Sequence, residues 1–240
     1  MKTVYWAPLF RLPEQASWGL SLESPRLVLP ELQETRMRTE ATRNDSWFVC
    51  TSFLEFSKNL YYMPNPIETA LSFDLVNNDI YALDSSNKMT TANIRTQMVK
   101  DAVTVTFNYG MIFFSEESLS FTAYPSFMHR SSWGDQGYCI PGVFDISKWF
   151  RPVSLEIQLN PGITSLKIPK NDPLFYFKTN EEISLQKFFM TDKLLEFMSS
   201  CVGFKQLEPK KPLSYLYDRF NKSGNKQQIL KEIRSNLVNE

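Results

Sequence analysis

Short alternating segments with turn residues between them fill the middle of the chain, and they constrain the fold more than any other feature. Apolar and polar residues alternate in residues 68–83 and again from 101 to 127. Further strand-like segments follow at 138–146, 153–159, 163–168 and 173–178. Proline, glycine and asparagine at 161–163 and 169–173 favour turns between the last of these. Short strands at this spacing predict an antiparallel sandwich or barrel-like body.

The pattern changes near residue 180, where helical spacing of apolar residues replaces alternation. Residues 225–238 place Ile229, Ile233 and Leu237 on one helical stripe. The segment before them ends at Gly224, a residue type that is common just after a helix. The end of the chain therefore predicts two or three helices, and the chain is expected to be mainly β and α+β overall.

These two patterns divide the chain into a β-rich body, residues 1–180, and C-terminal helices, residues 181–240, that pack on the body or on a partner. Within the body, residues 11–45 carry several prolines and many polar side chains, so we expect an extended arm or loops there. The charged part of this segment, residues 31–45, reads as a solvated linker or a short exposed helix.

Charge balance and cysteine content indicate an intracellular chain. Lys+Arg and Asp+Glu number 26 each, so no overall attraction to nucleic acid or an anionic membrane is expected, while self-association meets little repulsion. Three cysteines far apart in sequence argue against a disulfide scaffold. No apolar run approaches the roughly 18 residues of a membrane helix, and the N-terminal residues lack the apolar centre of a signal peptide. We expect a cytoplasmic protein without membrane contact.

Few side chains offer catalytic or metal chemistry. His129 is the only histidine, which excludes three-histidine zinc sites and the two-histidine iron site within one chain. The cysteines lack C-x-x-C spacing, and no glycine-rich phosphate loop occurs. We therefore predict no metal and no cofactor. His129 lies in a polar loop, where it is either a general base or a surface histidine. Cys139 is either its nucleophilic partner or structural.

A series of short motifs runs through residues 130–177. Arg130-Ser131-Ser132 comes first, followed by Gly142-Val143-Phe144-Asp145 and Trp149-Phe150-Arg151, and Asn171-Asp172-Pro173 closes the series. This order resembles the trimeric dUTPase and dCTP deaminase group, with its Arg-Ser-Gly, Gly-Val-Ile-Asp and Tyr-Arg-Gly motifs. Ser132 stands where that family has glycine, and helices replace its glycine-rich C-terminal arm.

The resemblance implies a nucleotide site between the subunits of a trimer. Asp145 would lie near the deoxyribose and the catalytic water, with Arg130 and Arg151 completing the site. The residues taken alone favour a plainer interpretation, in which Gly142 and Asp145 shape a turn before an edge strand that begins at Pro152.

The surplus of aromatic residues indicates core packing or a subunit interface. The candidate interface residues are Trp133, Trp149, Phe150, Ile229, Ile233 and Leu237. The leading hypothesis is a non-enzymatic interaction or structural protein that contacts a protein partner or another copy of itself. The aromatic-rich and glycine-poor composition resembles that of uncharacterised proteins of tailed phages, so a bacteriophage accessory or virion component is expected. The alternative is a nucleotide-binding or nucleotide-hydrolysing protein of the dUTPase-like β-fold.

Overall fold

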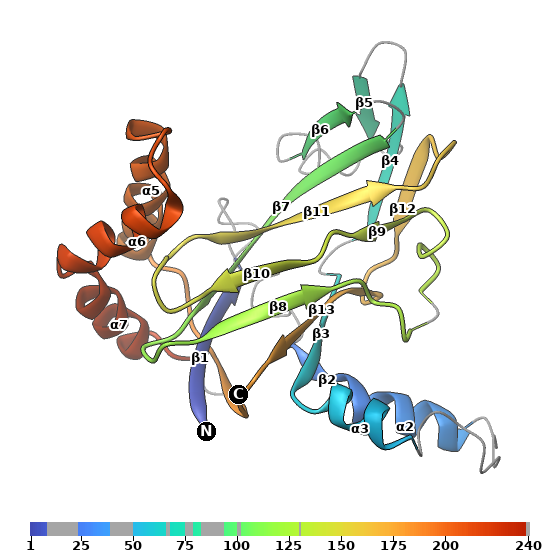
Figure 1. Ribbon diagram of the computed structural model, residues 1–240, viewed down its shortest axis with the longest axis horizontal. Coiled ribbons are helices and arrows are strands. Elements are labelled where there is room, and N and C mark those ends of the chain that lie inside the picture. Colours follow the sequence, from blue (N-terminus) through green and yellow to red (C-terminus); the bar gives the residue numbers. More distant parts are fainter. Residues whose placement is uncertain are drawn as a thin grey trace.

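The chain forms a β-rich body with helices at two of its sides (Figure 1). The computed structural model describes residues 1–8, 24–38, 50–65, 68–74, 79–82, 94–99, 102–129 and 131–238. The predicted fold class, mainly β and α+β with antiparallel sheets and C-terminal helices, is confirmed.

The described strands form three sheets. Sheet A has the order β14 (Ile183–Lys187), β1 (Lys2–Pro8), β7 (Ala102–Phe114), β11 (Pro152–Leu159) and β9 (Gly137–Cys139), and β6 (Ile94–Val99) also pairs with β7. Sheet B has the order β10 (Gly142–Asp145), β8 (Ser120–Tyr124), β13 (Pro173–Thr179), β3 (Leu60–Pro64) and β2 (Arg26–Leu27). Sheet C contains β12 (Ser165–Ile168), β4 (Thr69–Asp74) and β5 (Asp79–Ala82). Among these pairs only β1 with β14 is parallel.

One bent segment joins sheets A and B. β9 pairs with β11, and the Ile140 N–H continues this pairing by donating to the Glu156 carbonyl over 2.7 Å. The chain then passes Pro141 and enters β10, which pairs with β8. Because a single segment changes sheets here, the two sheets are closed on this side in a barrel-like manner.

The structure has turns at the two places between strands where the sequence predicts them, residues 161–163 and 169–173. Gly162 has a φ of 80° in a turn that the Ile163 N–H closes by donating to the Asn160 carbonyl. A proline followed by glycine suits this geometry, because glycine adopts positive φ without a steric penalty. Asn171 has a φ of 70°, which asparagine tolerates better than most residues. The predicted hairpin pairs β4 with β5, and its turn lies outside the described residues.

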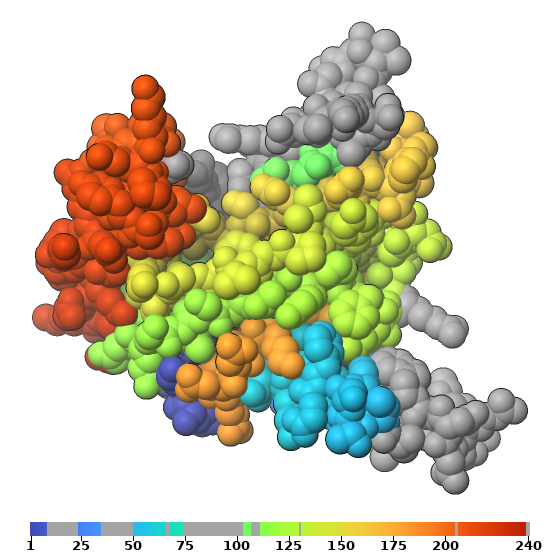
Figure 2. Space-filling view, in the orientation of Figure 1, coloured from blue at the N-terminus to red at the C-terminus, as the bar shows by residue number. Residues whose placement is uncertain are grey.

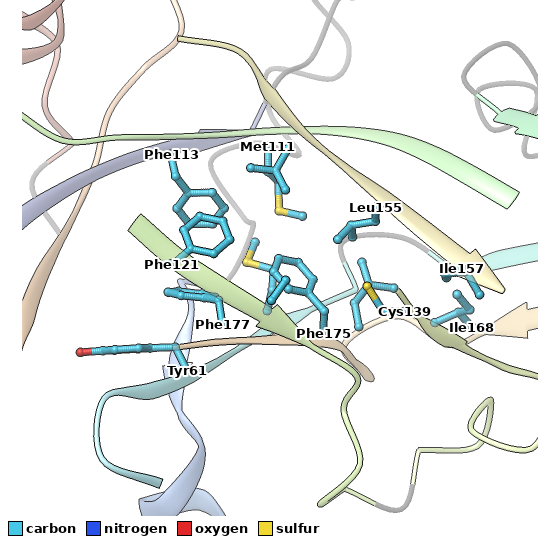
Figure 3. Packing of buried hydrophobic residues seen from close by; sticks show 14 of the residues in the cluster. Tyr61, Met111, Phe113, Phe121, Cys139, Leu155, Ile157, Ile168, Phe175 and Phe177 are labelled. Carbon is cyan, nitrogen blue, oxygen red and sulfur yellow. The ribbon is translucent and has the colours of Figure 1, made fainter. Parts of the chain in front are cut away.

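Alternate residues of the central strands face different cores. In β7, Met111 and Phe113 belong to the core between sheets A and B, whereas Ile112 and Phe114 face the C-terminal helices. Phe113 and Phe177 are 5.4 Å apart between ring centroids, and Tyr61 stacks on Phe177 at 5.3 Å. Figure 3 shows these rings lined up across the sandwich. Burial on both faces explains why the end of β7, residues 111–114, is continuously apolar although the earlier residues of the strand alternate.

The C-terminal helices are α5 (Asp192–Leu207), α6 (Leu213–Lys222) and α7 (Asn225–Ser235). Their buried side chains, including Leu194, Phe220 and Ile233, pack with Phe114 on the outer face of sheet A. The apolar stripe of α7 thus covers a sheet of the same chain. Gly224, with a φ of 76°, lies between α6 and α7 at the predicted helix boundary.

The remaining described helices cover the outer face of sheet B. They are α2 (Val28–Arg38) and α3 (Thr51–Ser57). α2 lies in the segment 11–45 that is expected to be an extended arm or loops, and its residues 31–38 overlap the charged part, for which a short exposed helix is the alternative. Val28 and Leu32 explain why a helix forms here and packs on sheet B. Residues four apart share one face of a helix, and both of these side chains are buried against the sheet.

Candidate functional site

A cluster of polar side chains lies on the outer face of sheet B, beneath α2. Tyr62 of β3 and Tyr176 of β13 are direct neighbours in the strand register, so their side chains share this face. Glu31 lies one helical turn after the buried Val28 and is thereby directed toward Tyr62. His129, from the segment after β8, reaches the same two tyrosine rings at 5.1 and 5.5 Å.

The Tyr176 hydroxyl holds the segment after β8 in place. The backbone N–H groups of Met128 and His129 donate to it over 3.1 and 2.9 Å. The same oxygen lies 2.5 Å from Nδ1 of His129. A tyrosine hydroxyl has two acceptor positions and one proton. Since the two amides occupy the acceptor positions, the hydroxyl proton is donated to Nδ1, and neutral His129 must carry its own proton on Nε2.

Glu31 completes the cluster from the opposite side. Its Oε2 accepts a hydrogen bond from the Tyr62 hydroxyl, and Nη1 of Arg26 lies 3.9 Å from the same oxygen. Oε1 of Glu31 lies 3.9 Å from Nε2 of His129. Among the described residues, Nε2 is buried without a hydrogen-bond partner. A protonated donor and a carboxylate therefore face each other just beyond hydrogen-bonding distance.

Burial sets the protonation states in this cluster. It lowers the pKa of His129, and the charges of Glu31 and Asp172 oppose this effect only in part. It also raises the pKa of Tyr176 and of Tyr62, the latter with help from Glu31. At neutral pH the cluster therefore holds a neutral imidazole and two protonated phenols, and its hydrogen bonds fix the backbone of the neighbouring loop.

A group of apolar residues lies beside this cluster, and we call it the Phe127 patch: the exposed Phe127 and the partly buried Phe56, Tyr124 and Met128. The Phe127 side chain is 60% exposed. Its ring nevertheless contacts Phe56 at 6.1 Å and the buried Tyr176 at 5.6 Å. Phe56 in turn meets Tyr124 edge-on at 5.8 Å. In Figure 2 the surface of α3, in cyan, lies beside the green surface of the segment around β8.

The residues of the nucleotide-site prediction have local roles in the structure. Oδ1 of Asp145 accepts hydrogen bonds from the Ser147 N–H and hydroxyl, over 3.1 and 2.7 Å. The Arg151 guanidinium lies over the Trp149 ring, 5.7 Å from its centroid. Arg130 lies outside the described residues. The charges of Arg151 and Asp145 act on the pKa of Tyr217 in opposite directions, and a nucleotide site around these two residues stays a prediction.

The candidate interface residues are mostly interior. Five of the six are buried in this chain: Trp133, Trp149, Phe150, Ile229 and Ile233. Leu237 is 38% exposed and forms a β-bridge with Phe188. Trp133 belongs to the sandwich core, and the other four buried residues belong to the core beneath the C-terminal helices. Their apolar character is thus used for packing within the chain.

The buried cysteines are thiols at neutral pH. Burial raises the pKa of Cys139 and that of Cys201 to about 12 each. Reactivity of a cysteine depends on its thiolate form. Neither residue is therefore prepared for nucleophilic attack. Within the described ranges, no group of three histidine, cysteine, aspartate or glutamate side chains is arranged to hold a metal ion.

No family model, curated protein or solved structure matches this chain. No helix in the described part of the chain combines the length and the apolar character needed to cross a bilayer. The functional assignment therefore depends on the geometry of the chain itself.

Sequence reasoning identified His129 but missed its partners. Glu31, Tyr62 and Tyr176 come from three segments whose proximity depends on strand register. The sequence also gives no sign that Phe127 is exposed, because Phe127 continues an alternating segment in which such a residue is expected to be buried. The nearest signal in the sequence is Pro125, which marks the end of the strand and places the next residues in a loop.

Proposed function

We propose that this chain is a non-enzymatic interaction protein that acts through protein–protein contacts, with the Phe127 patch at the centre of its contact surface. This proposal depends on one observation: an exposed phenylalanine packs against ordered aromatic rings on its other side. Phe127 is 60% exposed although its ring contacts Phe56 and Tyr176.

Such an arrangement suits a binding hot spot. Aromatic side chains are enriched at the centres of protein interfaces, where water is excluded on binding. Phe127 projects from a loop whose backbone is fixed by the Tyr176 hydroxyl. Little conformational entropy is then lost when a partner covers the ring.

The rim of the patch supports a second copy of this chain as the partner. Glu55 and Lys58 form a salt bridge on α3, with N···O at 2.6 Å, and their side chains are 61% and 63% exposed. Lys178 lies over the Phe56 ring at 4.7 Å. In a two-fold dimer the same surface meets itself, so Glu55 of one copy can face Lys58 or Lys178 of the other. A chain with 26 basic and 26 acidic residues adds little overall repulsion to this contact.

Sedimentation equilibrium of the purified chain over a range of concentrations tests the proposal. We expect reversible association of the wild type and at least about tenfold weaker association of Phe127→Ser, since hot-spot truncations cost roughly 2 kcal/mol or more. Leu207→Ser is the matched control, because Leu207 is 81% exposed at the end of α5, which packs on the outer face of sheet A and not on sheet B. A wild type that stays monomeric, or two variants that weaken association equally, would contradict the proposal. A viral origin stays a prediction from composition.

A further inference from the structure

We propose that His129 is an acid-sensitive latch: protonation of its imidazole breaks the contact with Tyr176 and releases the loop that carries Phe127. This inference rests on the proposed function, because the loop is part of the proposed contact surface. In this proposal, the protonation state of His129 regulates binding through the Phe127 patch of the same chain.

Protonation is incompatible with the hydrogen bonds that His129 makes. Nδ1 lies 2.5 Å from the Tyr176 hydroxyl oxygen, and the two backbone donors on that oxygen leave Nδ1 as the acceptor of its proton. A protonated imidazole donates from both nitrogens and accepts at neither. The Tyr176 oxygen cannot accept a third donor, because the N–H groups of Met128 and His129 already occupy its two acceptor positions. One of these bonds must therefore break when Nδ1 gains a proton.

A new partner for the protonated ring lies within reach. Oε1 of Glu31 is 3.9 Å from Nε2, and a small ring movement toward α2 would turn this approach into a charged hydrogen bond. The movement leads away from Tyr176 and thus away from the anchor of the loop. The cluster thereby offers His129 one partner when neutral and another when charged.

Within the part of the chain that the structure describes, the charged and titratable groups that act on the ring come from four elements and one turn. Glu31 from α2 and Asp172 from the turn before β13 favour the charged ring. Arg26 from β2 lies beside Glu31 and weakens its attraction for a second cation. Tyr62 from β3 and Tyr176 from β13 are neutral because burial raises their pKa values. Burial of His129 itself is the largest effect and lowers its pKa, so the neutral form holds at neutral pH.

The same contacts carry the change to the binding surface. The Tyr176 hydroxyl anchors the backbone at residues 128 and 129, directly after Phe127, and the Tyr176 ring is part of the platform under Phe127. Movement of the charged ring toward Glu31 pulls residue 129 away from Tyr176, weakens these two backbone hydrogen bonds and lets the loop leave its ordered position. A partner that needs an ordered Phe127 would then bind more weakly in acid.

Nuclear magnetic resonance of the full chain tests the latch directly, because His129 is the only histidine and gives unambiguous ring signals. At neutral pH we expect the tautomer with the proton on Nε2. On acidification we expect a titration midpoint below the ordinary value for histidine of about 6.5. The amide signals of Met128 and His129 should move with the same midpoint. The other tautomer, a midpoint at or above the ordinary value, or unmoved amide signals would overturn the inference.

Two variants connect the latch to association. His129→Asn keeps an acceptor near the Tyr176 hydroxyl but does not titrate, so its association should stay constant where that of the wild type weakens several-fold in acid. Tyr176→Phe lacks the anchor and should associate weakly at every pH. An equal acid effect in wild type and His129→Asn would overturn the inference while leaving the proposed function intact. If the wild type does not associate at any pH, the proposed function fails, and the ring and amide signals still decide whether the latch exists.

Discussion

At the scale of single residues, the fold depends on a few positions that have room only for glycine. Gly137 is the clearest of them, since it begins β9 at the point where that strand pairs with β11. A Cβ atom at this position would lie 2.6 Å from the Gln158 carbonyl oxygen and 3.3 Å from Cγ2 of Ile157. The close approach involves backbone, which cannot rotate away. The pairing of β9 with β11 therefore needs glycine at this position.

Replacing Gly137 by alanine should lower the free energy of unfolding by about 1–3 kcal/mol, the usual cost of overpacking. Urea denaturation measures this change. Gly203→Ala is the matched control, because nothing lies within 4 Å of a Cβ built there. Gly203 lies inside α5, where alanine should raise the stability by roughly 0.5–1 kcal/mol. Equal effects of the two substitutions would refute the close approach at β9.

At the scale of elements, the end of the described chain ties α7 to the edge of sheet A. The Phe189 N–H donates to the Asn236 carbonyl over 2.8 Å, and the Val238 N–H donates to the Lys187 carbonyl over 2.9 Å. These bonds flank the bridge between Phe188 and Leu237. They cover the outer side of β14 at its C-terminal end, where unpaired backbone groups would otherwise invite another strand.

Val238→Pro removes the N–H that bonds to Lys187 and should lower the stability by about 1 kcal/mol, the net value of one such hydrogen bond. Val238→Ala keeps the N–H and serves as the control. Amide hydrogen exchange offers a second measurement, since the opening should appear first in α7 and residues 187–189. If the alanine variant loses as much stability as the proline variant, the side chain and not the bridge holds this end.

At the scale of the whole molecule, the sequence predicts which segments form strands and helices, but not which distant segments contact each other. The alternation in residues 153–159 and the stripe with Ile229 and Ile233 correctly predict burial of one face. The predicted edge strand at Pro152 is wrong, because β11 lies between β7 and β9. Leu237 does not continue the stripe, since α7 ends at Ser235 and Leu237 forms a β-bridge. The cluster around His129 could not be predicted, because it joins α2, β3 and β13 through a strand register that no local pattern encodes. The exposed position of Phe127 depends on the same packing.

We expect deoxynucleotides to leave the thermal midpoint of the chain unchanged, with or without Mg²⁺. Both hydrogen bonds that reach Oδ1 of Asp145 come from Ser147, two residues further along. A bound nucleotide at about 100 times its dissociation constant would add roughly 2.7 kcal/mol of stability, which a thermal-shift screen detects. A shift with dUTP or dCTP that Asp145→Ala abolishes, but Asp135→Ala does not, would establish the nucleotide alternative.

Hydrogen–deuterium exchange at low and at high protein concentration both detects self-association through the Phe127 patch and locates the contact. We expect added protection at high concentration to be confined to α3 and residues 124–129, and to disappear in Phe127→Ser. Protection elsewhere on the chain, or an exchange pattern that does not depend on concentration, would contradict self-association through the Phe127 patch.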